Sequence, residues 1–399
     1  MMLPVAVDEA QAIAKQPTLR ALQIGMWWQT EQSGGLDRIF SNLVHTLPDV
    51  GVEVAGVVEG PSDVDTMTGG RVHSFAPEAA GWVTRMRGLR RTIATEIEKF
   101  DPHVIAVHFA MHAAVAGRRI RERPMVMHFH GPWSAEAEQE GASRYTVTAK
   151  KFVEGRVYRQ ADRTIVLSKA FGRLVAERFG VTEDRLRLIP GHVDIDRFAV
   201  AQTMAEARGI LGWPQDRPIL VSVRRLTQRM GLENLIVAMK RVAAVCPDVL
   251  LYVAGSGPNA QSLKRQVIET GLERQVHFLG FVSEKLLPFV FRAAQLNVVP
   301  TLALEGFGLV AAEALAAGTP SMVTPIGGLP EVVADLTTDL IFQSSHPNDI
   351  ADGVIAALVG SIRMPDQESC RAYAAAQFAT HLAARRTAEV YRRLVSCEG

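Results

Sequence analysis

Short apolar runs separated by helical segments recur along the whole chain, and this pattern constrains the fold more than any other feature. In the first half, the runs cover residues 19–28, 52–58, 104–109, 125–129 and 164–167. They are uninterrupted rather than alternating with polar residues, as expected for parallel strands that helices cover on both faces. Helical periodicity lies between most of them, for example at residues 36–47, 85–100 and 151–159. The first half therefore predicts an open α/β sheet.

The same pattern starts again after a connector near residues 190–200. We predict further strands at residues 219–223, 249–254, 276–278, 296–299 and 321–324, and helices at residues 232–245, 260–270, 285–293 and 309–317. A chain of 399 residues is too long for one ordinary core. The expected fold class is therefore α/β, with two doubly wound, Rossmann-like domains facing a central cleft. Ligands of such sheets bind beyond the carboxyl ends of the strands.

The pattern also predicts the domain limits. We expect an N-terminal extension over residues 1–18, an N-terminal domain over 19–198 and a C-terminal domain over 199–377. Residues 378–399 follow the last strand of the second sheet and contain a helix, expected at 382–396. We predict that this helix packs back on the N-terminal domain.

Composition excludes several classes of function. The net charge is +1, with 43 basic and 42 acidic residues, which gives no support to nucleic-acid binding. The three cysteines have no metal-ligand spacing and are typical of reduced thiols in a cytoplasmic protein. Charged residues interrupt the first fifteen positions, and no apolar run is long enough to span a bilayer. We therefore expect a cytoplasmic protein, with peripheral contact at the inner membrane face left open.

The segment TLALEGFGLVAAEALAAGTP, residues 301–320, carries the strongest local signal. It follows a predicted strand, and Gly306 and Gly308 would let the backbone approach a ligand closely. A helix begins near Leu309, and its free N–H groups form a natural phosphate site. Glu305 and Glu313 flank this helix start and could accept hydrogen bonds from sugar hydroxyls. The alternative is that Glu313 is a solvated helix residue and Glu305 only a partner of the helix dipole.

Two other loops of the second half also follow strands. The segment VSVRRLTQRMG, residues 221–231, places Arg224, Arg225 and Arg229 where guanidinium groups could bind diphosphate oxygens. Solvated surface arginines are the alternative, and we favour that interpretation for Arg224. The loop AGSGP, residues 254–258, contains Gly257 and is equally compatible with a plain turn.

The first half offers two weaker candidates. Gly34 and Gly35 open a helix after the first strand, which would suit a backbone anion site or a tight turn. His128 and His130 flank Phe129, so alternation places both imidazoles on one face of the sheet. A histidine there is more often a hydrogen-bonded core residue than a catalyst. We favour His130 for function because Gly131 and Pro132 place it beside a loop.

Two patterns carry little weight. Asp63–Asp65 and Asp194–Asp196 match the D-x-D spacing of some metal sites, but three-residue patterns of common residues arise by chance. A helical stretch contains Trp82 and Leu89 together with the arginines 85, 87, 90 and 91. It could contact an anionic membrane surface, although a solvated helix face is the commoner explanation.

Taken together, these segments resemble family 4 of the retaining glycosyltransferases over roughly residues 20–395. The match is most specific where Glu305 and Glu313 fit the family's E-x7-E signature, which continues into EALAAGTPSMVTPIGGLPEVV. The GG loop, His130, IPGHVDIDRF, VAGSGP and HFLGFVSEKLLPFVFRAAQLNVVPT also match.

The resemblance implies a GT-B fold and a definite reaction. A hexose would move from a nucleotide-diphosphate donor, UDP- or GDP-linked, to an acceptor glycan, lipid or small molecule, with retention of anomeric configuration. The path would be a front-face one, with neither a metal nor a cofactor. The nucleotide sugar would be a co-substrate.

The resemblance also implies roles for individual residues. His130, Arg225 and Glu305 would be catalytic, with Arg225 at the diphosphate. Glu313 would hold the ribose hydroxyls, and Val282 would lie near the base. The sugar and β-phosphate would meet Glu305 and the backbone of Phe307, Gly308, Leu309 and Val310. The remaining donor-site residues would be Gly34, Gly35, Arg229 and Gly257.

The chain departs from the family pattern at its diphosphate loop. The family usually has G-R-L-x-x-x-K-G, whereas here Arg224 replaces the first glycine and Met230 replaces the lysine. Arg229 is a candidate to supply the missing charge. The connector also has Gly191-His192 where the family commonly has Asn-Gly. Two alternatives therefore stay open: an epimerase-like GT-B enzyme that acts on nucleotide sugars, and a non-catalytic homologue that serves as a partner subunit.

Overall fold

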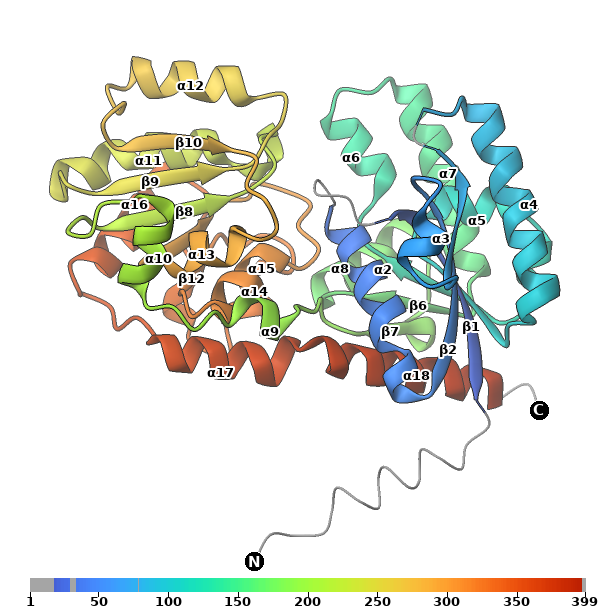
Figure 1. The fold of residues 1–399 in the computed structure, drawn as a ribbon. Helices are drawn as coiled ribbons and strands as arrows, with labels where there is room; N and C mark the ends of the chain where they lie inside the picture. Colours follow the sequence, from blue (N-terminus) through green and yellow to red (C-terminus); the bar gives the residue numbers. More distant parts are fainter. Residues whose placement is uncertain (1–17, 29–33, 78, 397–399) are drawn as a thin grey trace, which may run out of the picture. The chain divides into compact units, whose positions relative to one another are not determined.

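The computed structural model describes residues 18–28, 34–77 and 79–396, which form two compact units (Figure 1). Among the described residues, the first unit comprises those up to Leu167, residues 171–190 and residues 380–396. The second comprises residues 168–170 and 191–379. The crossover at residue 190 comes earlier than the expected limit at residue 198. The earlier limit has a structural reason. The Val193 N–H donates to the Phe378 carbonyl at 2.8 Å, which joins the connector to the second unit.

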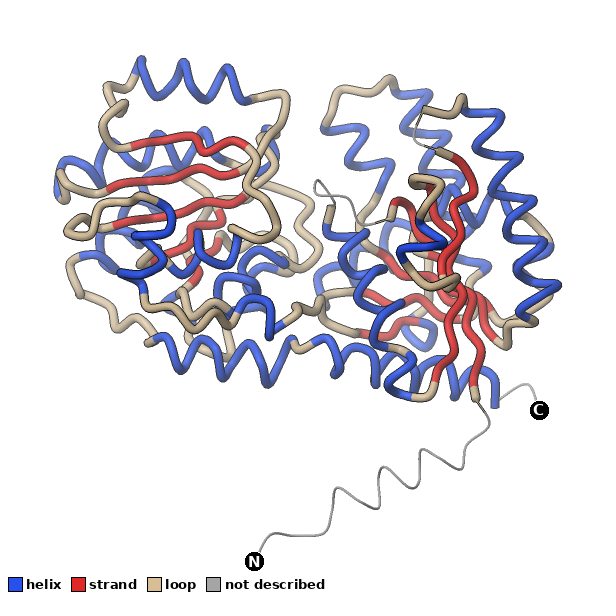
Figure 2. The backbone as a smooth tube through the Cα atoms, viewed as in Figure 1, coloured by secondary structure: helices blue, strands red, loops and turns tan. Residues whose placement is uncertain are grey.

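The first unit contains a seven-stranded parallel sheet with strand order β3-β2-β1-β4-β5-β6-β7 (Figure 2). The strands are β1 Leu19–Trp27, β2 Val52–Glu59, β3 Val72–Ala76, β4 Val104–Val107, β5 Met125–Phe129, β6 Arg163–Val166 and β7 Leu186–Leu188. The five inner strands were predicted. The edge strands β3 and β7 were missed, because each is short and interrupted by polar residues, so neither forms an apolar run.

Helices cover this sheet, and one of them comes from the far end of the chain. The helices are α2 Gly35–Thr46, α3 Val64–Met67, α4 Trp82–Phe100, α5 Ala110–Ala116, α6 Trp133–Gln139, α7 Arg144–Gln160, α8 Lys169–Phe179 and α18 Thr380–Ser396, with 3-10 turns at Pro48–Val50, Arg119–Arg121 and Glu183–Arg185. Helix α18 buries Tyr391 completely, and the Arg392 guanidinium donates to the Val50 carbonyl at 2.5 Å. These contacts make the last helix part of the first unit.

The second unit is built on a five-stranded parallel sheet with strand order β10-β9-β8-β11-β12 (Figure 2). Its strands are β8 Ile219–Val223, β9 Leu250–Ala254, β10 Val276–Gly280, β11 Leu296–Val299 and β12 Ser321–Val323. Its helices are α9 Ile195–Phe198, α10 Met204–Leu211, α11 Leu232–Val245, α12 Ala260–Glu269, α13 Leu287–Arg292, α14 Leu309–Ala316, α15 Leu329–Val333, α16 Pro347–Leu358 and α17 Gln367–Phe378, with 3-10 turns at Gln228–Met230 and Thr338–Leu340.

Each sheet has one point where the strand order reverses. In the second sheet the chain moves outward from β8 to β10 and then returns to place β11 on the other side of β8. In the first sheet β1 and β4 are the corresponding neighbours. Loops that leave the two strands at such a point diverge, which opens a crevice beyond their carboxyl ends. Topology alone therefore draws attention to the loops after β8 and β11, and to those after β1 and β4.

Candidate functional site

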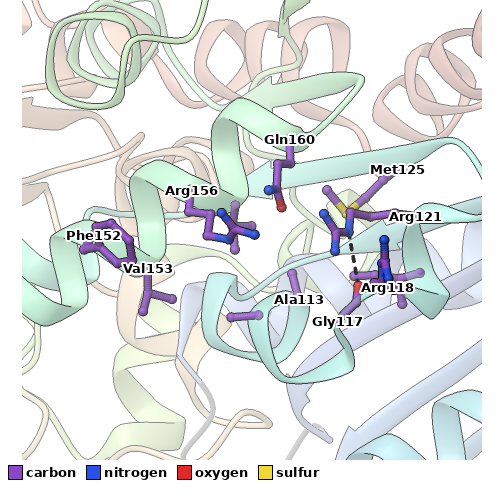
Figure 3. A pocket seen from close by; sticks show the side chains of 12 residues that line it. Ala113, Gly117, Arg118, Arg121, Met125, Phe152, Val153, Arg156 and Gln160 are labelled. Carbon is purple, nitrogen blue, oxygen red and sulfur yellow. Dashed lines mark hydrogen bonds between the residues drawn. The ribbon is translucent and has the colours of Figure 1, made fainter.

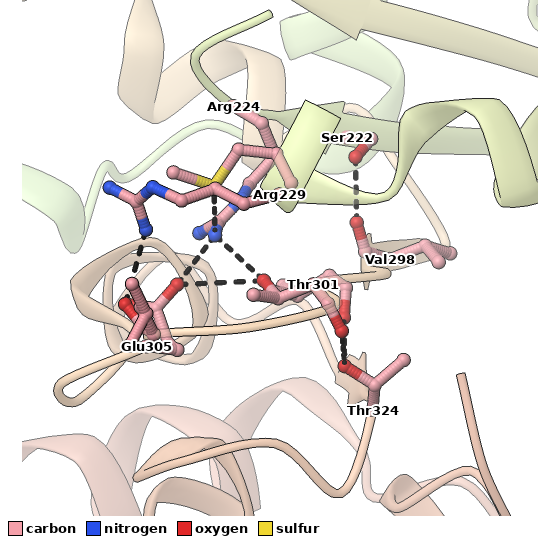
Figure 4. Close-up of polar contacts among 10 residues, drawn as sticks. Ser222, Arg224, Arg229, Val298, Thr301, Glu305 and Thr324 are labelled. Atoms are coloured by element: carbon pink, nitrogen blue, oxygen red, sulfur yellow. Dashed lines mark hydrogen bonds and ion pairs between the residues drawn. The ribbon is translucent and has the colours of Figure 1, made fainter. Parts of the chain in front are cut away.

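The loops after β8 and β11 bring a basic and an acidic side chain together at the reversal point of the second sheet (Figure 4). Arg224 directly follows β8, and Glu305 lies in the loop between β11 and α14. The Arg224 Nη2 atom lies 2.5 Å from the Glu305 Oε2 atom and donates to Thr301 Oγ1 at 2.7 Å. The Arg224 side chain is only 6% exposed. The prediction that Arg224 is a solvated surface arginine is therefore wrong, because its charge is buried and paired.

Met230 lies against the same guanidinium group. The Arg224 Nη2 atom is 2.7 Å from the Met230 sulfur, and Met230 is buried. Met230 closes the short turn Gln228–Met230, which returns the chain toward the end of β8. Arg224 thus brings a positive charge to the position where the family's lysine is replaced by methionine.

The other two arginines of this loop have different surroundings. Arg229 is half-buried, and its Nη1 atom donates to the Leu304 carbonyl at 3.1 Å (Figure 4). Leu304 has φ of +55°, a left-handed conformation that is costly for a branched side chain. The Arg229 guanidinium therefore braces a strained residue next to Glu305. Arg225, for which the resemblance implies a place at the diphosphate, is exposed.

Gly308 marks the start of helix α14 and has φ of +95°. A Cβ atom here would lie 2.4 Å from the Leu329 Cδ2 atom, so the position requires glycine for both backbone and space. The predicted neighbours Phe307 and Val310 are buried, and Leu309 is half-buried. At a helix start the first N–H groups lack a carbonyl one turn earlier; in α14 the Ala311 N–H donates to the Gly308 carbonyl at 2.8 Å.

Glu313 lies inside α14 and is only 5% exposed. The helix sequence LVAAEALA is apolar on every side of this carboxylate, and every residue from Val310 to Ala316 is buried. The alternative that Glu313 is a solvated helix residue is therefore wrong. A carboxylate is retained in a buried helix only with strong polar partners, which makes Glu313 a binding candidate.

The loops after β9 and β10 lie at the same edge of this sheet. Leu226 donates its N–H to the Ser256 carbonyl at 2.9 Å, and Gly255 donates to the Gly280 carbonyl at 2.7 Å. Gly257 has no room for a side chain, since a Cβ atom would lie 2.4 Å from the Leu226 carbonyl oxygen. Val282 is half-buried just beyond β10. Backbone bonds thus join the loops that carry Arg224, Gly257 and Val282.

In the first unit, Gly34 caps helix α2. Its N–H donates to the Asp37 Oδ2 atom at 3.2 Å, and the Trp27 N–H donates to Asp37 Oδ1 at 3.1 Å. An acidic side chain of the chain itself therefore already uses the Gly34 N–H. Gly35 is the first residue of the helix and is exposed. The preceding Gln32 and Ser33 lie outside the described residues.

His128 lies within β5, and His130 directly follows the strand beside the Gly131-Pro132 loop. His128 is buried in the strand and lies 2.9 Å from the Tyr391 hydroxyl, as expected of a hydrogen-bonded core histidine. His130 follows the strand, is half-buried, and lies 3.0 Å from the Nδ1 atom of His108. The sequence analysis missed His108 and Tyr391, because neither forms part of a motif. The reversal point beside β4 was the one signal that could have drawn attention to His108.

A cavity of about 250 Å³ lies elsewhere in the first unit, beneath α7 (Figure 3). The guanidinium groups of Arg118, Arg121 and Arg156 surround it, and Met125 and Phe152 add apolar lining. Met125 is the first residue of β5, whereas His130 follows its last, so the cavity and His130 are at opposite ends of this strand. The cavity is therefore separate from the candidate catalytic residues of this unit.

Helix α4 packs its apolar residues Leu89 and Ile93 into the core of the first unit. Leu89 is fully buried, and Arg85 is paired with the buried Glu59. Trp82 is 65% exposed at the start of the helix. No helix among the described residues is both long and apolar enough to cross a membrane.

The two D-x-D matches have structural partners. Asp65 pairs with His73 at 2.6 Å, and Asp194 accepts the Arg197 N–H at 3.2 Å as the cap of α9. In the part of the chain that the structure describes, no three acidic, histidine or cysteine residues are arranged to hold a metal ion. Burial raises the pKa of Cys370 to about 12, while Cys397 lies outside the described residues.

Comparison with known families agrees with the motifs. A family model described as Glycosyltransferase Family 4 matches residues 33–197, and one described as Glycosyl transferases group 1 matches residues 203–377. The chain belongs to the family 4 glycosyltransferases. An uncharacterised glycosyltransferase of Methanocaldococcus jannaschii is 32% identical to this chain. The match covers 49% of this chain and 50% of the relative. The D-inositol 3-phosphate glycosyltransferase of Mycolicibacterium smegmatis is 33% identical over 51% of the chain and 47% of its own length.

Solved structures confirm the GT-B fold of this family 4 glycosyltransferase. A sucrose-phosphate synthase from Thermosynechococcus elongatus superposes with a TM-score of 0.79 at 22% identity, covering 95% of this chain and all of its own. HepE from Anabaena, in complex with UDP and glucose, gives a TM-score of 0.76 at 19% identity, covering 94% of this chain and all of its own. In sequence, by contrast, the match spans about half the length of the curated relatives named above.

Proposed function

We propose that this protein is a retaining hexosyltransferase that uses a nucleotide-diphosphate sugar as its donor. The observation that carries the proposal is the pairing of Arg224 with Glu305 beside the start of α14, at the reversal point of the second sheet. A guanidinium group and a helix N-terminus suit the charge of a diphosphate, and a carboxylate suits sugar hydroxyls. Neighbouring loops supply the guanidinium group and the carboxylate. A ligand that carries both a diphosphate and sugar hydroxyls therefore fits these loops best.

The donor roles follow the E-x7-E pattern. Buried Glu313 would accept hydrogen bonds from the ribose hydroxyls, and Val282 would pack near the base. Glu305 and the backbone from Phe307 to Val310 would hold the sugar and the β-phosphate. Negative charge grows on the diphosphate as the glycosidic bond breaks, so fixed positive charge there stabilises the transition state more than the ground state.

Arg224 is our candidate for the cation that the family's lysine would supply. Its guanidinium touches the Met230 sulfur, whereas Arg229 donates to the Leu304 carbonyl. Met230 was the reason to consider a non-catalytic homologue, and the charge of Arg224 weakens that reason. Arg225 keeps its proposed place at the diphosphate, for which its exposure leaves it accessible.

UDP is the nucleotide that we propose first, because HepE has been solved with UDP and glucose and also with UDP-glucose. We propose that neither a metal ion nor another cofactor takes part, since cationic side chains and the helix start can neutralise the diphosphate. The D-inositol 3-phosphate glycosyltransferases among the relatives make that compound the first acceptor to test.

The test is an assay of the purified chain with UDP-glucose, UDP-galactose, UDP-N-acetylglucosamine and GDP-mannose. We expect release of nucleoside diphosphate with at least one donor, stimulated by an acceptor and unaffected by EDTA. Proton NMR of the product should show the anomeric configuration of the donor. Interconversion of free nucleotide sugars would favour the epimerase-like alternative. No turnover and no donor-induced rise in melting temperature would favour the non-catalytic one.

A further inference from the structure

Five polar side chains form one continuous hydrogen-bonded series in the first unit, here called the histidine chain. In order they are His130, His108, Gln23, Tyr391 and His128. The successive links join His130 Nε2 to His108 Nδ1 at 3.0 Å, His108 Nε2 to Gln23 Oε1 at 2.9 Å, Gln23 Nε2 to the Tyr391 hydroxyl at 3.0 Å, and that hydroxyl to His128 Nε2 at 2.9 Å. All except His130 are at most 3% exposed. Water therefore cannot readily replace these links.

The strand order explains how these residues meet. Gln23 lies on β1, His108 directly follows β4, and His128 lies on β5, and these are three adjacent strands. Val107 pairs with Met127, so the next step of the same register places His108 beside His128. Their rings stack with centroids 4.2 Å apart and an interplanar angle of 10°. Tyr391 reaches the group from helix α18, 368 positions after Gln23.

The amide of Gln23 gives the series a direction. Its oxygen can only accept, so His108 must carry its proton on Nε2. A neutral imidazole has one N–H, so His108 Nδ1 is an acceptor and His130 must donate from Nε2. On the other side, the Gln23 amide nitrogen donates to the Tyr391 oxygen, which leaves the phenolic proton for His128 Nε2. Every link then has one donor and one acceptor.

Two further observations support this arrangement of protons. Burial raises the pKa of Tyr391 well above its ordinary value, so the hydroxyl keeps the proton that the series needs. The rings of His108 and His130 are also nearly coplanar, with centroids 5.2 Å apart and an interplanar angle of 18°, as a hydrogen bond in the ring plane requires. Ring plane and proton position are therefore both defined for His130.

We propose that Gln23, His108 and Tyr391 are positioning residues that hold His130 as the Nε2–H tautomer and so make Nδ1 its accepting atom. This inference rests on the proposed function and on the catalytic role that the family resemblance implies for His130. In this tautomer His130 Nδ1, which takes no part in the histidine chain, is the ring nitrogen that accepts a hydrogen bond from a substrate hydroxyl group. Through Tyr391, helix α18 therefore contributes to the reactivity of His130.

The first test is a nitrogen-15 NMR spectrum of the histidine-labelled full chain without substrate. We expect His130 to show a protonated Nε2 and an unprotonated Nδ1. His112 is an internal reference of the opposite kind, because its Nδ1 atom must donate to the Gly25 carbonyl at 2.8 Å. A His130 spectrum with the proton on Nδ1 would overturn the proposal. Since no substrate is needed, this result stands apart from any failure of the proposed function.

The second test is Tyr391→Phe, which removes one hydroxyl and keeps the ring. We expect mixed tautomer signals for His130 and a kcat lower by about tenfold, part of the 10²–10⁴-fold that a positioned acid–base group contributes. The donor KM should change less than twofold. Thr387→Val, at another buried position of α18, is the control for altered packing and should leave the His130 signals unchanged. Unchanged signals and kcat in folded Tyr391→Phe would contradict the proposal. If Tyr391→Phe fails to fold, Gln23→Leu breaks the same series and has the same two readouts.

Discussion

Arg224 and Glu305, 81 positions apart in the sequence, form an ion pair whose side chains are 6% and 15% exposed. The local sequence around each residue does not explain this burial and pairing. The pair exists because β8 and β11 are neighbours in the sheet although β9 and β10 lie between them in sequence. The loops after these strands therefore depend on each other for both charge balance and position.

The first prediction follows from this dependence and concerns stability. Arg224→Ala leaves the Glu305 carboxylate in a largely buried position without its partner, which should lower the free energy of unfolding by about 3 kcal/mol. Arg225→Ala changes the exposed neighbour and should cost no more than about 0.5 kcal/mol. Urea unfolding followed by circular dichroism measures both. Equal effects of the two substitutions would show that the buried pair does not stabilise the fold.

The second prediction tests whether turnover needs a positive charge at this place, whichever residue supplies it. Arg224→Gly should lower kcat by about a hundredfold, as loss of one transition-state donor does elsewhere. The double variant Arg224→Gly/Met230→Lys restores the family pattern and should recover most of this loss. Met230→Lys alone places a second cation against Arg224 and should give no gain.

Initial rates at saturating donor measure this cycle, and Arg229→Ala tests the competing candidate for the missing charge. If Arg229→Ala alone were as damaging as Arg224→Gly, and the double variant recovered nothing, Arg229 would be the replacement for the lysine.

The third prediction concerns Glu313. Glu313→Gln keeps the size of the side chain and removes its charge, so the loss of charge-assisted hydrogen bonds to the ribose should weaken UDP binding by about 1.5–3 kcal/mol. Isothermal titration calorimetry of UDP measures this directly. Uridine should lose as much affinity as UDP, because both carry the ribose. An unchanged affinity in a folded variant would remove Glu313 from the nucleotide site.

The fourth prediction concerns acid stability and rests on His112. Burial lowers the pKa of His112 from 6.5 to about 4, although its bond to the Gly25 carbonyl opposes this shift. Between these two values the unfolded chain binds a proton that the folded chain does not, so stability falls as the pH drops from about 6.5 to 4. The loss should reach about 3 kcal/mol across this window. His112→Asn should reduce this slope in urea titrations, whereas His381→Asn, at an exposed histidine, should not.

The inner strands were predictable because burial on both faces requires unbroken apolar runs. Strands β8 and β11 begin and end where the sequence placed them. Strand β7, with the sequence LRL, lies at the edge of its sheet and has no such requirement. The edge strands β10 and β12 were nevertheless predicted, because each is an apolar run, so it is the polar residue within β7 rather than its edge position alone that hid it.

The candidate site was predictable only where a motif held adjacent residues. Glu305, Gly308 and Glu313 belong to one segment whose pattern was visible. Arg224 looked like a surface arginine because the carboxylate that pairs with it comes from another loop. The partners of His130 were missed for the same reason, since Gln23, His108 and Tyr391 come from three separate parts of the chain.

The membership of α18 in the first unit has a consequence for synthesis. Ribosomes produce the chain from its N-terminus, so strands β1 to β7 emerge long before Tyr391. Until then, Gln23 and His128 lack the hydroxyl that joins them, and the Val50 carbonyl lacks Arg392. All residues of the second unit, up to Ala379, are present before that helix is made. The first unit to be translated is therefore the last to complete its core.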